Sequence, residues 1–344
     1  MLQSRRNMLV SSLLGAGALT LPASQPAFAD FGRSKNRGSL ARRIIAEFRR
    51  LPGKKGLKIL APAVDGAREF QVAIKPQRAL FCASSFKGFV LAEYLRQVEA
   101  GEATLHEQLE LDESVWSPGA PVFNPPELAG EVSALTTLQA MISRSDNTAT
   151  DMILHRIGAD RVREFIASIG LQSTRIPTTT RQFFGYISGF PQWETITWDE
   201  VVELLENDPF PTNPIINDTI TMAASPHDFV SFYSRALQGE FFEKPETLLT
   251  FRSVLALADS IPRGFPLGVN AFLKGGSIDF AGEHALSLAG GMYVPDRWVY
   301  FSLIINWTDA EGGTTADEGP GFAAASMQIF TSIRDELGNC SFSA

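Results

Sequence analysis

A serine and a lysine stand three residues apart in the apolar stretch ASSFKGFVL, as Ser84 and Lys87. Three residues make most of a helical turn, so both side chains can share one face of a helix. Burial lowers the pKa of an amine, so Lys87 in this setting could accept the Ser84 proton and make the hydroxyl nucleophilic. A helix that begins at Ser84 would also offer backbone N–H groups to a developing oxyanion. A helix cap followed by a lysine that reaches solvent fits the same four residues.

Two further polar clusters contain residue types that could act on a substrate. Ser145-Asp146-Asn147 interrupts two helical stretches, and Lys274-Gly275-Gly276-Ser277 follows a predicted strand at 269–273. Lys274 could bind a carboxylate, and the paired glycines would let a ligand approach the backbone. Each cluster also has a purely structural interpretation. The first could be a polar turn whose Asp146 or Asn147 caps the next helix, and the second a charged strand edge followed by a turn.

The elements that would position these clusters follow from the spacing of the apolar residues. Ser39 can cap a first helix, Thr136 and Gln139 form a possible capping box, and Asp65-Gly66 is a hairpin signal. The predicted strands span 57–61, 69–74, 267–274, 285–293 and 298–307; the predicted helices include 39–50 and 322–337, and residues 84–206 are mostly helical. This order predicts an α+β fold with one antiparallel sheet built from both ends of the chain, flanked by helices, and an inserted all-helical lobe.

The first 29 residues have the features of a cleavable export signal. Arg5 and Arg6 precede an apolar run, and Ala27-Phe28-Ala29 is an A-x-A cleavage pattern. The stretch SRRNML is similar to a twin-arginine signal, which predicts a periplasmic or otherwise exported protein. A membrane anchor is the alternative, but the run is short and interrupted. We therefore expect one mature catalytic domain at 30–344, with a sheet lobe at 39–83 and 218–344 and a helical lobe at 84–217.

Charge and composition restrict the classes of partner and cofactor. The chain of 344 residues has a formal net charge of −8, which becomes −10 without the two arginines of the predicted signal. Such an acidic surface argues against nucleic acid or anionic lipid as the main partner. The two cysteines, Cys82 and Cys340, could pair only if the C-terminal tail folds back, and a free, buried Cys82 is the simpler expectation. The four histidines show no metal-ligand spacing, and no feature demands a metal, nucleotide or organic cofactor.

The three clusters occur in the order S-x-x-K, S-D-N, K-[TSG]-G, which is the motif set of class A β-lactamases and penicillin-binding proteins. Over about residues 39–340, the chain resembles the class A β-lactamase superfamily. The resemblance implies the fold of that superfamily and a serine hydrolase that opens β-lactam amide bonds through an acyl-Ser84 intermediate. We expect a monomer that acts on a small molecule, without nucleic acid, as the acidic charge indicates, and without a stable membrane anchor.

The resemblance also assigns roles to single residues. Ser84 would be the acylated nucleophile and Lys87 its proton acceptor, while Ser145 would pass a proton to the leaving nitrogen. Asn147 would hydrogen-bond the amide of the substrate side chain, and Lys274 with Ser277 would hold the substrate carboxylate. The backbone N–H groups of Ser84 and Ser277 would form the oxyanion hole, and Gly276 would be one of the substrate-binding residues.

One expected residue is absent. Class A β-lactamases carry a glutamate on the Ω loop that activates the deacylating water, and the matching position here is Thr180. A new helix is predicted at 197–206, but its Glu200 fits a capping box with Thr197, and Glu203 and Glu206 fall on the solvated face. The sequence therefore retains the residues of acylation and lacks the expected deacylating base. A serine esterase, a D-alanyl peptidase and a penicillin-binding protein that turns over poorly remain as alternatives.

Overall fold

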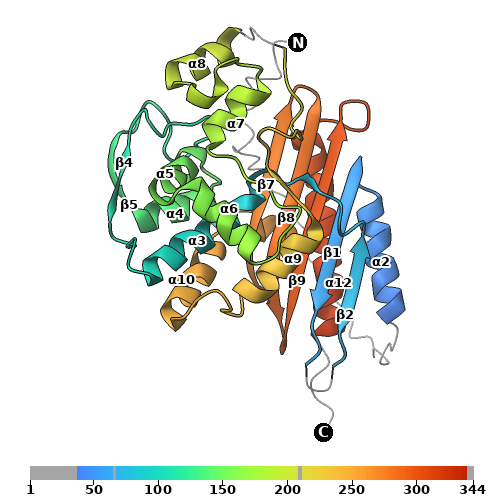
Figure 1. Cartoon of the computed structure of the whole chain (residues 1–344). Helices are drawn as coiled ribbons and strands as arrows, with labels where there is room; N and C mark the ends of the chain where they lie inside the picture. Colours follow the sequence, from blue (N-terminus) through green and yellow to red (C-terminus); the bar gives the residue numbers. More distant parts are fainter. Residues whose placement is uncertain (1–36, 65–66, 208–210, 339–344) are drawn as a thin grey trace, which may run out of the picture.

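A five-stranded antiparallel sheet forms the centre of the molecule, as a computed structural model covering residues 37–64, 67–207 and 211–338 shows (Figure 1). The strand order is β2-β1-β9-β8-β7. The strands are β1 Lys54–Ala61, β2 Phe70–Ile74, β7 Asn270–Phe280, β8 Glu283–Val294 and β9 Arg297–Thr308. Strands from the two ends of the chain therefore meet, with Leu57 opposite Leu303, and β7 is left at the edge.

The sheet is buried on both faces, which explains the composition of its middle strand. Nearly every residue of β9 is buried, in the almost unbroken apolar run WVYFSLIINW. A strand covered on both sides loses the polar alternation of a half-exposed strand. Helices α2 (Arg37–Arg49) and α12 (Thr315–Leu337) pack together on one face, and α9 (Pro226–Ala236) lies on the other (Figure 1).

The remaining helices form a lobe beside the edge strand β7 (Figure 1). They are α3 Lys87–Glu99, α4 Ala134–Ser143, α5 Asn147–Ile157, α6 Ala159–Ser168, α7 Thr180–Ile187, α8 Trp198–Asn207 and α10 Pro245–Leu255. The short α11 Ile261–Gly264 packs against α12 on the other face of the sheet. Two 3₁₀ turns, η1 Ala83–Phe86 and η2 Trp193–Thr195, and two short strand pairs complete the chain. These pairs are β3 Leu80–Phe81 with β6 Ala223–Ala224, and β4 Gln108–Leu111 with β5 Gly130–Ser133.

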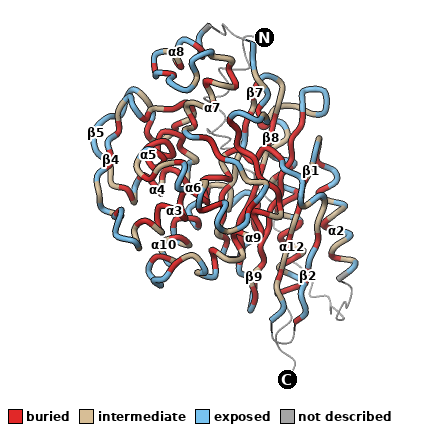
Figure 2. The backbone as a smooth tube through the Cα atoms, in the orientation of Figure 1, coloured by how far each residue is buried: buried red, intermediate tan, exposed pale blue. Residues whose placement is uncertain are grey.

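Two large apolar cores hold the molecule together, and most of the buried segments in Figure 2 belong to them. The larger core joins the helical lobe to one face of the sheet, and the second lies between the other face and helices α2 and α12. In the second core the ring of Phe330 stacks on Phe265 with centroids 4.3 Å apart and lies 4.7 Å from Phe301. The sheet is thus fixed from both sides, so its edge strand is a rigid wall for the neighbouring lobe.

The predicted α+β architecture is confirmed, including the antiparallel sheet with flanking helices and the helical lobe. Two local predictions were wrong. Lys274–Ser277 do not follow a strand end but lie inside β7, which continues to Phe280 because it pairs with β8 along its whole length. The cap of α4 is Ser133, whose hydroxyl accepts the Thr136 N–H, so the cap lies three residues before the predicted one and the helix begins at Ala134.

Several sequence-based expectations fall on parts of the chain outside the described residues. These are the predicted export signal at 1–29, the turn at Asp65-Gly66 and Cys340. Cys82 is described, and it is buried and free. Among the helices that the structure describes, none combines the length and apolar character needed to cross a bilayer.

Replacing Phe330 by alanine tests the second core. The ring is fully buried between two other rings, so Phe330→Ala should lower the free energy of unfolding by about 3–5 kcal/mol. Leu267→Ala removes a side chain that is 92% exposed and should stay within about 0.5 kcal/mol of the parent. Urea unfolding followed by tryptophan fluorescence measures both, and equal losses in the two variants would contradict this packing.

Candidate active site

Ser84 lies in the 3₁₀ turn η1, which runs directly into α3 at Lys87. Side chains three residues apart eclipse one another in a 3₁₀ turn, so Ser84 and Lys87 project from the same side of the backbone. The preceding Ala83 has a φ of +45°, a left-handed conformation that non-glycine residues adopt at a cost. The predicted start of a helix at Ser84 is therefore correct in place, although the first turn is tighter than an α-helix.

Hydrogen bonds to the sheet hold this turn in place. The N–H of Cys82 donates to the carbonyl of Met222, 2.8 Å away. The buried hydroxyl of Ser85 lies 3.1 Å from the Lys274 carbonyl and 2.7 Å from the Ser287 hydroxyl. The hydroxyl of Ser85 thus has a structural role, whereas Ser84 is partly exposed and available to a substrate.

The amine of Lys87 is buried inside the site, which rules out the alternative of a lysine that reaches solvent. Its Nζ donates to the Ser145 carbonyl at 2.6 Å and to Asn147 Oδ1 at 2.8 Å, and it lies 3.4 Å from Ser145 Oγ. Burial lowers the pKa of Lys87 well below its usual value, and the positive charge of Lys274 lowers it further. The carboxylates of Asp146 and Asp151 oppose this shift.

The Ser145-Asp146-Asn147 turn serves structure and chemistry together. Asp146 caps α5 by accepting the Ala149 N–H, and its other oxygen accepts the N–H groups of Val122 and Phe123. The predicted capping role is therefore real. Asp146 also holds its neighbour Ser145 in place. Ser145 has a φ of +59°, and its side chain and carbonyl lie beside the Lys87 amine.

The side chain of Asn147 is fixed at both ends. Its Nδ2 donates to the carbonyl of Pro118 at 2.6 Å, and its Oδ1 accepts from Lys87. A Cβ at the neighbouring Gly119 would lie 2.9 Å from that Nδ2, and Gly119 has a φ of +77°. The loop before α4 therefore presses against Asn147 where only glycine fits.

The β7 strand forms the opposite wall of the site. Lys274 is buried, its Nζ donates to the Gly275 carbonyl at 2.7 Å, and burial lowers its pKa to about 8. A Cβ at Gly276 would lie 2.6 Å from the Ser84 nitrogen, so the two backbones are in direct contact. Ser277 is exposed on the same strand. The edge strand thus brings Gly276 and Ser277 beside the first turn of α3.

The predicted site residues therefore converge from three parts of the chain, with one qualification. Lys87, Ser145 and Asn147 are joined by hydrogen bonds, Gly276 touches the Ser84 backbone, and Lys274 acts on Lys87 through its charge. Within the described residues no hydrogen bond joins Lys87 to Ser84, because the amine is turned toward Ser145 and Asn147. Lys87 must change its partners to take the Ser84 proton.

Sequence reasoning missed Asp151, a buried carboxylate next to this site. Both of its oxygens accept hydrogen bonds from the segment that begins α7, at Thr180 and Arg181. Its spacing could have revealed it, since Asp151 follows Asn147 by four residues and so lies on the same face of α5. The glutamates of α8 lie as predicted. Glu200 forms a capping box with Thr197, and Glu203 and Glu206 are exposed.

A methyl group at position 276 tests the contact between β7 and the Ser84 turn. Gly276→Ala must displace the Ser84 N–H or the Cys82 carbonyl, so acylation of Ser84 should fall at least about 100-fold while the protein still folds. Gly319→Ala, on α12 with open space around it, is the matched control and should react like the parent. Stopped-flow absorbance with a chromogenic cephalosporin and circular dichroism measure rate and folding, and a fully reactive Gly276→Ala variant would refute the contact.

Comparisons with known proteins identify the family of this chain. The family described as the beta-lactamase enzyme family matches residues 40–295. A β-lactamase of Streptomyces fradiae is 28% identical over 177 residues, which cover 50% of this chain and 56% of that protein. This chain thus matches little more than half the length of that curated relative.

Solved structures show the same fold. The extended-spectrum β-lactamase TLA-1 superposes with a TM-score of 0.68 at 17% identity, over 89% of this chain and 100% of the other. PBP-A gives 0.62 at 19% identity, over 87% and 96%, and a β-lactamase of Chitinophaga pinensis gives 0.65 at 14%, over 87% and 99%. With most of its length matched by the family and its three motifs gathered around one buried lysine, this chain belongs to the beta-lactamase enzyme family.

Proposed function

We propose that this chain hydrolyses β-lactam amide bonds through an acyl-Ser84 intermediate, as class A β-lactamases do, and so inactivates antibiotics. One observation carries the proposal: the buried amine of Lys87, whose pKa is lowered, lies beside Ser145 and Asn147 and three residues after a partly exposed serine. A neutral amine at this place is the base that a serine nucleophile requires.

In the proposed acylation step, Lys87 first exchanges its bonds to the Ser145 carbonyl and Asn147 for one to Ser84. As the acyl compound binds, the Lys87 amine takes the Ser84 proton and Ser84 Oγ bonds to the carbonyl carbon. The backbone N–H groups of Ser84 and Ser277 stabilise the oxyanion, since Gly276 brings β7 against the turn. The proton then passes from Lys87 through Ser145 Oγ, 3.4 Å away, to the leaving nitrogen as the C–N bond breaks.

The deacylation step separates the two leading candidates. The water that releases the acyl group needs a base, and Thr180 supplies a hydroxyl where the family resemblance places a glutamate. A penicillin-binding protein that acylates and turns over poorly is therefore the second candidate, and the hydrogen bonds of Thr180 to Asp151 favour it. A lost general base costs about 10² to 10⁴ in rate. An esterase or a D-alanyl peptidase would use the same acylation residues.

The setting of this reaction is also part of the proposal. The twin-arginine pattern at Arg5 and Arg6 and the A-x-A pattern at 27–29 support export to the periplasm. The acidic net charge supports a small molecule as substrate, and we propose that the mature chain acts as a monomer.

Mass spectrometry of the mature protein with a chromogenic cephalosporin tests the proposed function. A covalent adduct on Ser84 should form and then disappear while many equivalents of product accumulate. Ser84→Ala should give no adduct and no product above background, because the nucleophile is removed.

Other outcomes of that experiment decide between the candidates. A stable adduct with one equivalent of product would favour the penicillin-binding protein. No adduct on the parent, with a Ser84→Ala variant that behaves identically, would refute β-lactam hydrolysis, and the same assay with an acyl ester would then test the esterase.

The two lysines predict the pH dependence of acylation. The rate should rise with pH as Lys87 loses its proton, well below the usual range of a lysine, and fall again near pH 8 as Lys274 loses the charge that binds a substrate carboxylate. Lys274→Arg keeps the charge and should move the alkaline limb upward. Stopped-flow rates from pH 5 to 10 measure both limbs, and an alkaline limb that is unchanged in Lys274→Arg would exclude this assignment.

A further inference from the structure

The buried carboxylate of Asp151 has no role in the acylation mechanism described above. It is 2% exposed on α5, and burial raises its pKa to about 6. Its Oδ1 accepts from the Thr180 N–H at 2.7 Å and the Thr180 hydroxyl at 2.8 Å, while Oδ2 accepts from the Arg181 N–H at 3.0 Å. The carboxylate therefore binds the first N–H groups of α7, whose positive dipole end stabilises it.

This arrangement excludes Asp151 as the base for the deacylating water. Oδ1 already accepts two hydrogen bonds and Oδ2 one, and the side chain is only 2% exposed, so its burial keeps both oxygens from a water that attacks the acyl group on Ser84. Its influence on the reaction must pass through the groups that it holds.

The residues held by Asp151 reach the loop before α4 in two ways. The Thr180 hydroxyl lies 2.7 Å from the buried hydroxyl of Ser117. The guanidinium of Arg181 donates to the carbonyls of Glu113 and Ser114, at 2.7 and 2.9 Å. Because Asp151 accepts the Thr180 hydroxyl proton, the Thr180 oxygen is left to accept from Ser117, which gives this chain of hydroxyls a direction. Asp151 thus attaches the loop to α5 through two consecutive residues of α7.

The loop in turn holds the residue that binds the catalytic amine. The carbonyl of Pro118, next to Ser117, accepts from Asn147 Nδ2 at 2.6 Å, and the Gly119 carbonyl accepts from the Asn147 N–H at 3.3 Å. Asn147 Oδ1 then accepts from Lys87. A continuous series of hydrogen bonds and backbone therefore leads from Asp151 through Thr180, the loop and Asn147 to Lys87.

We propose that Asp151 is a positioning residue for acylation, which acts through Thr180 and the 113–119 loop to hold Asn147 and the Lys87 amine in place. This inference rests on the proposed function. It gives Thr180 a role of its own, since the position where a deacylating glutamate is expected serves to orient the acylation residues instead.

The charge of Asp151 supplies a second, separable effect. Its carboxylate raises the pKa of Lys87, as that of Asp146 does, against the larger effects of burial and of Lys274 on β7. Arg181 is the charged residue that faces Asp151 from α7. Removing the Asp151 charge should therefore lower the pKa of Lys87, whereas removing the Thr180 hydroxyl leaves that charge in place.

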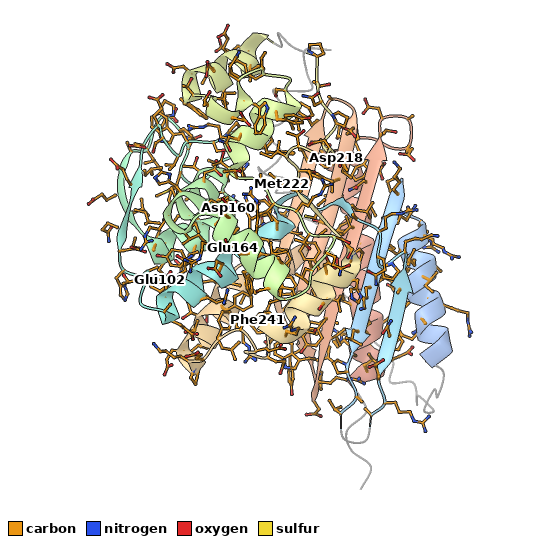
Figure 3. The ribbon with its side chains drawn as sticks, viewed as in Figure 1. Glu102, Asp160, Glu164, Asp218, Met222 and Phe241 are labelled. Atoms are coloured by element: carbon orange, nitrogen blue, oxygen red, sulfur yellow. The ribbon has the colours of Figure 1, made fainter. Side chains whose placement is uncertain are left out.

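Four variants separate these effects in the full mature chain. Asp151→Asn keeps the size but cannot accept from both Thr180 and Arg181, because one of its two polar atoms is now a donor. Thr180→Val removes only the hydroxyl, and Thr180→Ser restores it. Asp160→Asn, at the N-terminal end of α6 (Figure 3), is the matched control. This side chain is 86% exposed.

Two quantities are measured: the rate of Ser84 acylation by a chromogenic cephalosporin, and the titration midpoint of Lys87 by NMR of ¹³C-labelled lysine, assigned with Lys87→Arg. Asp151→Asn should acylate about 10- to 100-fold more slowly and lower the midpoint. Thr180→Val should slow acylation about 10-fold without lowering the midpoint. Thr180→Ser and Asp160→Asn should stay within about twofold of the parent.

The opposite results would overturn the proposal. If Asp151→Asn and Thr180→Val unfold at lower temperature but acylate as fast as the parent, Asp151 has a purely structural role. If the parent itself is never acylated, the proposed function fails, and the NMR titration alone decides for Asp151: an unchanged Lys87 midpoint in Asp151→Asn refutes its action on the amine. If Asp151→Asn does not fold, the acylation rates of Thr180→Val and Thr180→Ser are compared, and equal rates in these two variants would refute the proposal.

Discussion

The burial of one amine is the constraint on which the rest of this structure depends. Lys87 lies in α3, and its amine is hydrogen-bonded to the turn before α5. Burial and the charge of Lys274 on β7 lower its pKa, and the carboxylates of Asp146 and Asp151 raise it. A charged lysine in such a place would be expensive, and a neutral one is a base. The amine donates hydrogen bonds to the carbonyl of Ser145 and the amide oxygen of Asn147, so it is buried without being left unpaired.

The fold meets this constraint by assembling the site from rigid parts. The Ser84 turn is hydrogen-bonded to β7 and β8 through Ser85, and the sheet itself is packed from both faces. The Asn147 side is anchored differently, through Asp146 at the end of α5 and through the loop that precedes α4. The Ser84 turn thus meets β7 at Gly276, and Lys87 joins it to the Asn147 side through a hydrogen bond.

The sequence allowed the main features to be predicted, because the motifs and the apolar periodicity are local signals. The strands, the terminal helices and the residues Ser84, Lys87, Ser145, Asn147, Lys274 and Gly276 were all placed in the right region of the fold. The full length of β7 was not foreseen, since Gly275 and Gly276 look like a turn until β8 pairs with them. Asp151 was missed for a similar reason: its partners Thr180 and Arg181 lie some thirty residues away, and only tertiary contacts bring them together.

Two residues in left-handed backbone conformations flank the site, Ala83 before the serine and Ser145 beside the lysine. Each conformation costs about 1–3 kcal/mol for a side chain with a Cβ, a cost that glycine would avoid. Glycine at position 83 would remove this cost together with the stiffness that aims Ser84, whereas glycine at position 145 would remove the Ser145 hydroxyl itself. The protein thus retains backbone strain beside its reactive residues, and stabilising substitutions have to be sought elsewhere in the chain.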